Sequence, residues 1–127
     1  MTPPGDRPAT PRIAVVDDDD AVCAALVRLI RTARCDVDGF DSAEAFLAAG
    51  GRYACVVLDV ALPGLSGPDL EARMRAAGDA TPVIFINGGG DAAVREIARR
   101  TGRPSFGKPV DGIQLLIAVA LAVQSAS

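Results

Sequence analysis

Aspartate and lysine side chains give this chain its clearest means of doing chemistry. The aspartate run 17–20 follows one short apolar segment, Asp59 follows another, and Lys108 lies far downstream. Carboxylates that are held close together repel one another unless a cation lies between them. Hard divalent cations prefer oxygen ligands, and Mg2+ commonly combines one or two carboxylates with water and phosphate oxygens. If the fold brings them together, Asp17, Asp18 and Asp59 are therefore candidate Mg2+ ligands.

Some of these residues also allow a purely structural interpretation. Aspartate is a preferred N-cap residue and its charge is favourable at a helix N-terminus, so Asp19 or Asp20 would suit the start of a helix. Lys108 could be an exposed turn residue, as most lysines are, although Pro109 restricts its backbone to extended conformations. Asp59 is harder to explain in this way, because a buried strand rarely ends in a charge that has no partner.

The glycine run 88–90 allows two interpretations as well. It is either a flexible loop or a place where an oxyanion approaches backbone N–H groups closely. Its spacing matches neither the phosphate-binding loop of nucleoside triphosphatases nor the dinucleotide-binding fingerprint. A loop for a flavin phosphate after the first apolar segment is disfavoured, because the aspartate run 17–20 would repel the phosphate.

Composition narrows the classes of function. The chain has 127 residues, which suits one domain, and its hydrophobic fraction of 50% excludes an intrinsically disordered chain. Its net charge of −3 argues against a nucleic-acid-binding surface. It contains no histidine, so histidine-based catalytic triads and histidine metal sites are excluded.

The cysteines and the hydropathy pattern indicate a cytoplasmic protein. Three cysteines without a C-x-x-C pair form neither a disulfide framework nor a zinc site. Cys23, Cys35 and Cys55 lie among apolar residues and are predicted to be buried, inert thiols. No apolar run reaches the roughly 18 residues of a membrane span, and the N-terminus lacks the apolar stretch of a secretion signal. No contact with a membrane is expected.

Alternating strands and helices must position the candidate groups. Five short apolar segments are predicted as strands, at residues 13–16, 37–40, 54–58, 82–86 and 105–106. Helical patterns follow them in turn, at residues 20–33, 42–49, 68–77, 91–101 and 111–124. This alternation implies an α/β fold with a parallel sheet, right-handed crossovers and helices on both faces. Ligands in such folds lie at the carboxyl ends of the strands, where the aspartates, Asn87 and Lys108 are expected.

Several helices have recognisable starts and apolar faces. Ser42 is a plausible N-cap for the second helix, and Pro68 suits the first position of the third. The first helix has an apolar face formed by Val22, Leu26, Leu29 and Ile30. The last helix is expected to pack by the side that carries Ile113, Leu116, Ile117, Ala120 and Leu121.

Four stretches together resemble the receiver domain of two-component response regulators, over about residues 12–124. They are residues 13–19, 57–67, 82–88 and 108–109, each weak alone but specific in this order. The sequence around the third and fourth strands looks most like receivers of the family that includes nitrogen-fixation regulators. The resemblance implies an α/β, flavodoxin-like (βα)5 doubly wound parallel sheet with strand order 2-1-3-4-5.

The same resemblance assigns roles to the residues at the strand ends. Asp59 would be the phosphoacceptor, and Lys108 would bind a phosphoryl oxygen during in-line transfer. The ligands of Mg2+ would be Asp17, Asp18, Asp59 and the backbone carbonyl of Ala61. An aspartyl phosphate is an acyl phosphate and hydrolyses, so the chain is expected to promote only its own phosphorylation and dephosphorylation. It is not expected to be an enzyme that acts on other substrates.

The expected partners follow from this assignment. The donor would be a phosphohistidine on a sensor histidine kinase or a histidine phosphotransfer protein, which suits a chain without histidine. A downstream protein target would bind the face formed by the fourth helix, the fifth strand and the fifth helix, at about residues 91–124. A homodimer is left open, and direct binding to nucleic acid is not expected.

Two positions depart from the family pattern. Asn87 stands where a Thr or Ser hydroxyl turns toward the phosphoryl group; its amide can donate a hydrogen bond but cannot swing as a hydroxyl does. Ser105 stands where an aromatic residue is usual, and Phe106 should point to the other side because side chains alternate along a strand. An interaction module whose output does not depend on phosphorylation therefore stays open as an alternative. A phosphohydrolase is disfavoured, because Ala61 stands where such enzymes carry a second acid.

Two expectations concern the chain as a whole. Residues 1–11 are rich in proline and are expected to form a flexible tail, with the receiver domain at residues 12–127. The sequence ends soon after the last predicted helix. It is therefore expected to be a stand-alone receiver or a segment excised from a longer regulator.

Overall fold

A single parallel sheet between two layers of helices makes up the fold. The structure is a computed structural model in which residues 10–126 are described. The strands are β1 (Arg12–Val16), β2 (Asp36–Phe40), β3 (Cys55–Asp59), β4 (Val83–Asn87) and β5 (Ser105–Gly107). The helices are α1 (Asp20–Arg31), α2 (Ala43–Ala49), α3 (Gly67–Ala76), α4 (Asp91–Thr101) and α5 (Gly112–Ala126).

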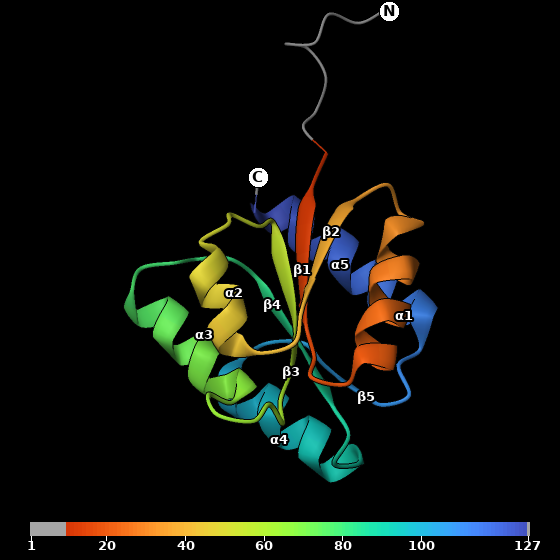
Figure 1. Ribbon diagram of the computed structural model, residues 1–127. Coiled ribbons are helices and arrows are strands. Elements are labelled where there is room, and N and C mark those ends of the chain that lie inside the picture. The colour runs from red at the N-terminus through yellow and green to blue at the C-terminus, as the bar shows by residue number, and fades with distance from the viewer. Residues whose placement is uncertain (1–9, 127) are drawn as a thin grey trace, which may run out of the picture.

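The order of the strands is the one predicted for a flavodoxin-like fold. The sheet runs β2-β1-β3-β4-β5, and every neighbouring pair is parallel. Helices α1 and α5 cover one face of the sheet, whereas α2, α3 and α4 cover the other (Figure 1). The flexible tail predicted for residues 1–11 falls mainly on residues 1–9, which lie outside the described residues.

Burial on both faces explains the unbroken apolar sequences of the central strands. Every residue of β3 and β4 is buried. One set of side chains packs against α2, α3 and α4, and the other packs against α1 and α5. Continuous apolar strands are typical of such parallel sheets. The register pairs Val16 with Leu58 and Asp59 with Ile86, so the carboxyl ends of these strands meet at one edge.

Side-chain caps set the first turns of α1, α2 and α3. Asp19 caps α1, its Oδ1 accepting hydrogen bonds from two backbone N–H groups at 3.0 and 3.1 Å. Ser42 caps α2, as predicted, and Ser66 caps α3. Helix α3 consequently begins at Gly67, and Pro68 lies one position later than expected. The structural interpretation of the aspartate run thus applies to Asp19 and leaves the two preceding aspartates available to the site.

The packing side of α1 is as predicted, but that of α5 is not. Leu26 and Ile30 of α1 are buried, whereas the buried residues of α5 are Leu115 (0% exposed) and Val119 (2%). Of the side predicted for α5, only Leu116 packs against the core. The other large side chains of that side are exposed: Ile113 (73%), Ile117 (49%) and Leu121 (61%).

The reason lies in the composition of α5. Residues 112–126 contain no charged side chain and few polar ones. An apolar pattern with no polar face opposite it does not identify the buried side, so tertiary contacts decide which side meets the sheet. Although α5 is this apolar, neither it nor any other described helix is long and apolar enough to cross a membrane.

Burial of the cysteines is only partly as predicted. Cys55 is fully buried in β3, and burial raises the pKa of its thiol to about 12. Cys23 and Cys35 are half-buried, because both lie beside β2, an edge strand with a neighbour on one side only. Burial still raises the pKa of both thiols, so all three cysteines are protonated near neutral pH.

Candidate functional site

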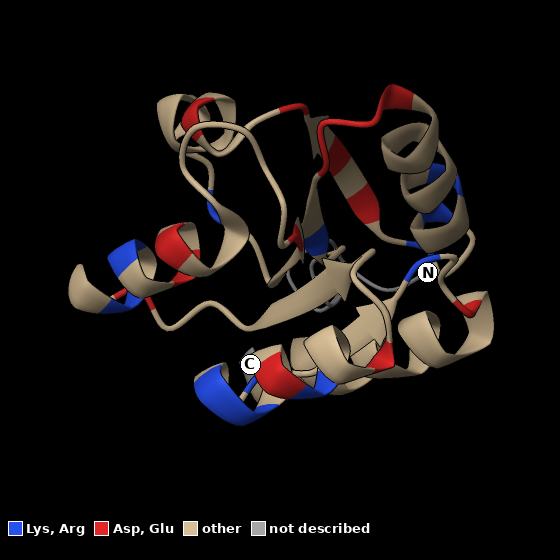
Figure 2. Cartoon of the chain, turned by 90° about the horizontal axis from the view of Figure 1, so that it is seen from below, with Lys and Arg blue, Asp and Glu red and all other residues tan. Residues whose placement is uncertain are grey.

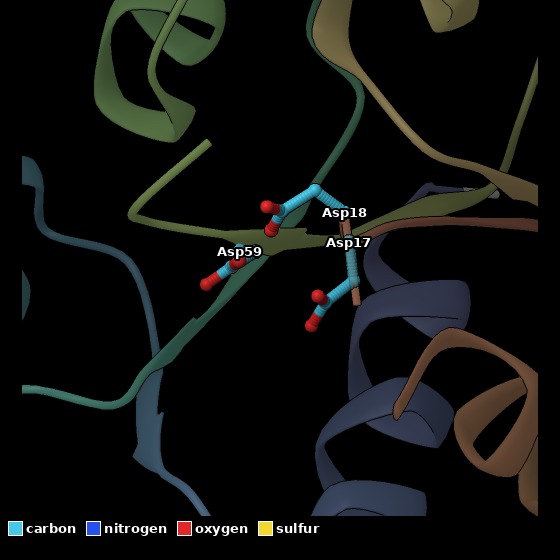
Figure 3. A group of neighbouring side chains, drawn as sticks. All are labelled: Asp17, Asp18 and Asp59. Carbon is cyan, nitrogen blue, oxygen red and sulfur yellow. The ribbon is translucent and has the colours of Figure 1, made fainter. Parts of the chain in front are cut away.

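The carboxyl ends of β1 and β3 bring three aspartates together. Asp17 and Asp18 directly follow β1, and Asp59 is the last residue of the neighbouring β3. One carboxylate oxygen of each lies within 4.8 Å of the others. Figure 3 shows the three side chains gathered at the ends of these strands. Figure 2 looks onto this edge, where acidic residues, in red, lie along the segment that follows β1. The fold therefore brings together the acids singled out in the sequence.

The three carboxylates differ in burial. Asp17 and Asp59 are 1% and 3% exposed, whereas Asp18 is exposed. Asp17 Oδ1 accepts a hydrogen bond from the backbone N–H of Asp19 at 2.9 Å, and Asp59 Oδ1 lies 3.4 Å from the backbone N of Ala61. Two ionised carboxylates buried this close together repel each other, so the site requires positive charge.

Lys108 supplies part of that charge. Its Nζ lies 3.0 Å from Asp17 Oδ2 and 3.3 Å from Asp59 Oδ1, and the side chain is 24% exposed. Burial lowers the pKa of Lys108, but hydrogen bonding and charge interactions with the two aspartates outweigh this effect and leave the pKa raised. The peptide bond to Pro109 is cis. Because the Lys108 side chain is mostly buried and pairs with two aspartates, its interpretation as an exposed turn residue is wrong.

The single ammonium group does not neutralise the site. Burial raises the pKa of Asp59, and the negative charge of Asp17 raises it further. Lys108 and the backbone N–H of Ala61 act in the opposite direction but do not reverse the shift. A raised pKa at a buried carboxylate with named charged neighbours is common at functional sites.

Replacing Asp59 with asparagine is expected to stabilise the fold near neutral pH. Because the pKa of Asp59 is raised on folding, its ionisation opposes folding at pH values above the folded pKa. This penalty disappears below the unfolded pKa of about 4. Thermal unfolding should therefore show a higher Tm for Asp59→Asn at pH 7 and a smaller gain near pH 4. Asp41→Asn, which removes an exposed carboxylate outside the cluster, is the control, and an equal gain at both pH values would contradict the assignment.

The donor set fits a hard divalent cation. Asp17 Oδ2 is buried, and the one partner found for it among the described residues is the Lys108 ammonium at 3.0 Å. A buried carboxylate oxygen with unused lone pairs, beside two further carboxylates, offers the oxygen ligands that Mg2+ prefers. The backbone carbonyl of Ala61, two residues after Asp59, is a fourth candidate ligand.

Asn87 borders the site from β4. Its side chain is 6% exposed, and its Oδ1 accepts a hydrogen bond from the backbone N–H of Gly89 at 2.9 Å. Its backbone carbonyl accepts a hydrogen bond from the N–H of Lys108 at 3.1 Å, which links the ends of β4 and β5. Because Oδ1 accepts the hydrogen bond from Gly89, Nδ2 is the donor group that the Asn87 side chain can offer to a ligand.

Ser105 and Phe106 face opposite sides of β5, as strand alternation predicts. Phe106 packs in the core against α1 and α5. Ser105 pairs with Phe85, whose ring belongs to the core on the α2–α4 side. The Oγ of Ser105 is buried, and no hydrogen bond to it is found among the described residues. On this side β5 therefore presents a small hydroxyl group, where the receiver domains that the sequence resembles usually have an aromatic ring.

One contact beside the site was not expected from the sequence. The loop between β3 and α3, at residues 60–66, carries Ala61, and the backbone N–H of Leu65 in that loop donates to Glu44 Oε2 at 3.0 Å. Glu44 lies in the first turn of α2. An acid at that position is explained equally well by the helix dipole, so the sequence held no signal that pointed to this contact.

The sequence matches known families and relatives over most of its length. Residues 13–120 match the family model of the response regulator receiver domain. The response regulator protein TodT of Pseudomonas putida is 38% identical over 117 residues, which cover 90% of this chain and 52% of TodT. The transcriptional regulatory protein FixJ of Bradyrhizobium diazoefficiens, a nitrogen-fixation-type regulator, is 37% identical over 117 residues, covering 90% of this chain and 57% of FixJ. The chain thus spans about half the length of these relatives.

A solved structure shares both the fold and much of the sequence. The crystal structure of a response regulator receiver protein from Burkholderia phymatum superposes with a TM-score of 0.79 and 36% sequence identity. The match covers 91% of this chain and 96% of that chain. The likeness therefore extends over essentially the whole sheet and its helices.

Proposed function

Since this chain belongs to the response regulator receiver domain family, we propose that it accepts a phosphoryl group on Asp59. The observation that carries the proposal is the meeting of Asp59 with Asp17 and Lys108 at one edge of the sheet. In the transfer, a carboxylate oxygen of Asp59 attacks the phosphorus of a phosphohistidine. The N–P bond breaks, and the imidazole nitrogen keeps the electron pair and takes up a proton.

The surrounding residues would stabilise the charge of the phosphoryl group. Lys108 would bind one phosphoryl oxygen through Nζ, and Asn87 would donate to another from Nδ2. The ligands of Mg2+ would be Asp17, Asp18, Asp59 and the backbone carbonyl of Ala61. When bound, Mg2+ supplies positive charge that offsets the charge of the carboxylates and of the phosphoryl oxygens.

The phosphorylated form would return to the free carboxylate by hydrolysis. Water attacks phosphorus, the bond between phosphorus and the Asp59 oxygen breaks, and inorganic phosphate leaves. Ala61 offers no second acid that would turn over external substrates, so the chain would promote only its own phosphorylation and dephosphorylation. It is therefore proposed as a signalling protein and not as an enzyme.

Incubation with Mg2+ and a small acyl phosphate, followed by intact-mass measurement, tests the proposal. The wild type should gain the mass of one phosphoryl group, and Asp59→Asn should gain none. The matched control is Asp20→Asn, which removes an exposed carboxylate from the same aspartate run and should be phosphorylated as the wild type is. A wild type without a mass gain, or a gain that persists in Asp59→Asn, would overturn the assignment.

The donor in the cell is proposed to be a sensor histidine kinase or a histidine phosphotransfer protein. We propose residues 12–127 as one receiver domain that acts in the cytoplasm. It would act either alone or as part of a longer regulator, as in relatives about twice its length.

Partner binding is proposed at the face formed by α4, β5 and α5. Ile113, Ile117 and Leu121 give this face exposed apolar side chains that a protein partner would cover. Phosphorylation should therefore shift backbone amide resonances mainly at residues 91–124. Because Asn87 and Ser105 replace the usual hydroxyl and aromatic pair, the shifts should be larger in the double variant Asn87→Thr, Ser105→Tyr. Shifts confined to α1 and α2 would contradict this placement.

An interaction module that does not respond to phosphorylation is the second candidate function. The observation that favours it is the buried Ser105 Oγ, which stands in place of an aromatic switch residue. In that case Asp59 would be phosphorylated normally, but no amide shifts would reach residues 91–124. The mass and resonance measurements together separate the two functions.

The phosphorylated form is expected to be short-lived. Hydrolysis needs water to reach phosphorus opposite the Asp59 oxygen, and the two positions that border that path in this fold are Ala61 and Gly89, both small. Ala61→Met should slow the loss of phosphoryl after donor removal by roughly threefold to tenfold, about 1 kcal/mol in the barrier. Equal decay of wild type and variant would show that access at this position is not limiting.

Gly89, the second position that borders the path of water, is less suitable for this test. A Cβ atom at Gly89 would lie 3.0 Å from Ala93 Cβ and 3.1 Å from Asn87 Oδ1. Gly89→Arg would therefore disturb the turn that holds Asn87 as well as shield phosphorus. If Gly89→Arg slows the decay and Ala61→Met does not, the effect arises on the Asn87 side of the site, from shielding or from the displaced amide.

A further inference from the structure

The base of the loop between β3 and α3 is closed tightly next to the phosphorylation site. The backbone N–H of Gly67 donates to the carbonyl of Val60 at 3.1 Å. A Cβ atom at Gly67 would lie 2.2 Å from the backbone carbonyl oxygen of Asp59, so the backbone approaches there as only glycine allows. Leu62, near the start of the loop, is buried in the core. The two ends of the loop are therefore fixed by β3 and by α3.

Residues 64 and 65, inside the loop and just before α3, also contact α2. The backbone N–H of Leu65 donates to Glu44 Oε2 at 3.0 Å. Gly64 has a φ of +74°, and a Cβ atom there would lie 2.9 Å from the same carboxylate oxygen. Glycine at position 64 thus permits both the left-handed turn and the close approach of Glu44. The Ser42 cap fixes the first turn of α2, so the carboxylate extends from an ordered helix.

The protonation state of Glu44 suits this contact. The hydrogen bond from the N–H of Leu65 lowers the pKa of Glu44, and the charge of Arg73 lowers it slightly further. The side chain is therefore an ionised acceptor near neutral pH. A hydrogen bond to an ionised acceptor is stronger than one between neutral groups.

We propose that Glu44 is a positioning residue: through Leu65 it holds the loop at residues 60–66 in place and so orients the backbone carbonyl of Ala61 toward the metal site. This inference rests on the proposed function, because it assigns that carbonyl to Mg2+. Glu44 itself touches neither the metal ligands nor the phosphoacceptor in any described contact. Outer residues that orient metal ligands alter metal affinity by about 10- to 100-fold when they are replaced.

Calorimetric Mg2+ titration of four proteins tests the inference. Glu44→Ala should weaken Mg2+ binding by about tenfold relative to the wild type. Glu44→Gln keeps an acceptor oxygen for Leu65 and should recover most of the affinity. Asp41→Asn removes an exposed carboxylate three residues earlier and serves as the control for lost negative charge, with little expected change.

A second measurement separates loop positioning from general destabilisation. Amide hydrogen exchange at Leu65 and its loop neighbours should speed up in Glu44→Ala, whereas the Tm should differ little from that of Asp41→Asn. If Glu44→Ala binds Mg2+ as the wild type does, the inference is overturned and the proposed function stands. If Glu44→Gln and Asp41→Asn weaken binding as much as Glu44→Ala, charge is the cause and the positioning role is overturned. If the wild type binds no Mg2+ and Asp59 is not phosphorylated, the proposed function itself fails.

Discussion

Replacing Lys108 with alanine should slow the phosphorylation of Asp59 by about 100-fold, the cost of losing one preorganised donor to a developing oxyanion. Lys108 is the only lysine in the chain, so no other ammonium group takes its place. The same variant should bind Mg2+ as tightly as the wild type or more tightly. The reason is that the Lys108 ammonium pairs with Asp17 and Asp59 and so competes with a cation for their charge. Rates from intact mass and affinities from calorimetry measure the two effects separately.

Stability provides an independent check on the same variant. Because the pKa of Lys108 is raised on folding, its pairing stabilises the fold below its ordinary pKa of 10.5 and is lost only above the raised value. Lys108→Ala should therefore lower the Tm at pH 7, and Mg2+ should restore part of the loss. Lys108→Arg keeps the charge and is the matched control. A variant in which phosphorylation and Mg2+ affinity fall together would show that Lys108 supports the metal site and does not compete with the cation.

Leu115→Ala is expected to destabilise the protein by about 2–5 kcal/mol, the usual cost of truncating a fully buried leucine. Leu115 is 0% exposed and packs in the core between α5 and the sheet. Ile117→Ala lies two residues away on the same helix, but its side chain is 49% exposed. This matched truncation should cost less than about 1 kcal/mol. The free energies of unfolding come from urea denaturation with each variant fitted for midpoint and slope.

The comparison of Leu115→Ala with Ile117→Ala also tests which side of α5 is exposed. Equal losses for the two variants would mean that the helix is rotated about its axis relative to the structure. If the chain associates through the face that carries Ile117, the loss for Ile117→Ala will grow with protein concentration, because association stabilises the folded form by mass action. A small loss that does not depend on concentration fits an apolar side that is open to a partner.

The order of the elements and the meeting of the acids were predictable from the sequence, and both are confirmed. Continuous apolar segments alternating with helical patterns specify parallel strands, and parallel strands place all their carboxyl ends at one edge. Asp17 and Asp59 follow or end such segments, so topology alone brings them together. The resemblance to receiver domains is likewise confirmed by the family match over residues 13–120. Helices α1 and α2 were predictable in detail because α1 has a polar face and α2 a capping serine.

Contacts between distant segments were decided only by the tertiary structure. The buried side of α5 could not be predicted, because a helix that is apolar nearly all round offers no contrast between its faces, and packing against β3 and β4 selects Leu115. The position of Lys108 at the edge of the sheet was expected from the sequence, but its direct pairing with two buried carboxylates depends on how its side chain packs there. The contact of Glu44 with the N–H of Leu65 joins residues 21 positions apart, and no pattern in either segment indicates it. Periodicity and strand ends carry local information, whereas such contacts exist only once the helices have packed on the sheet.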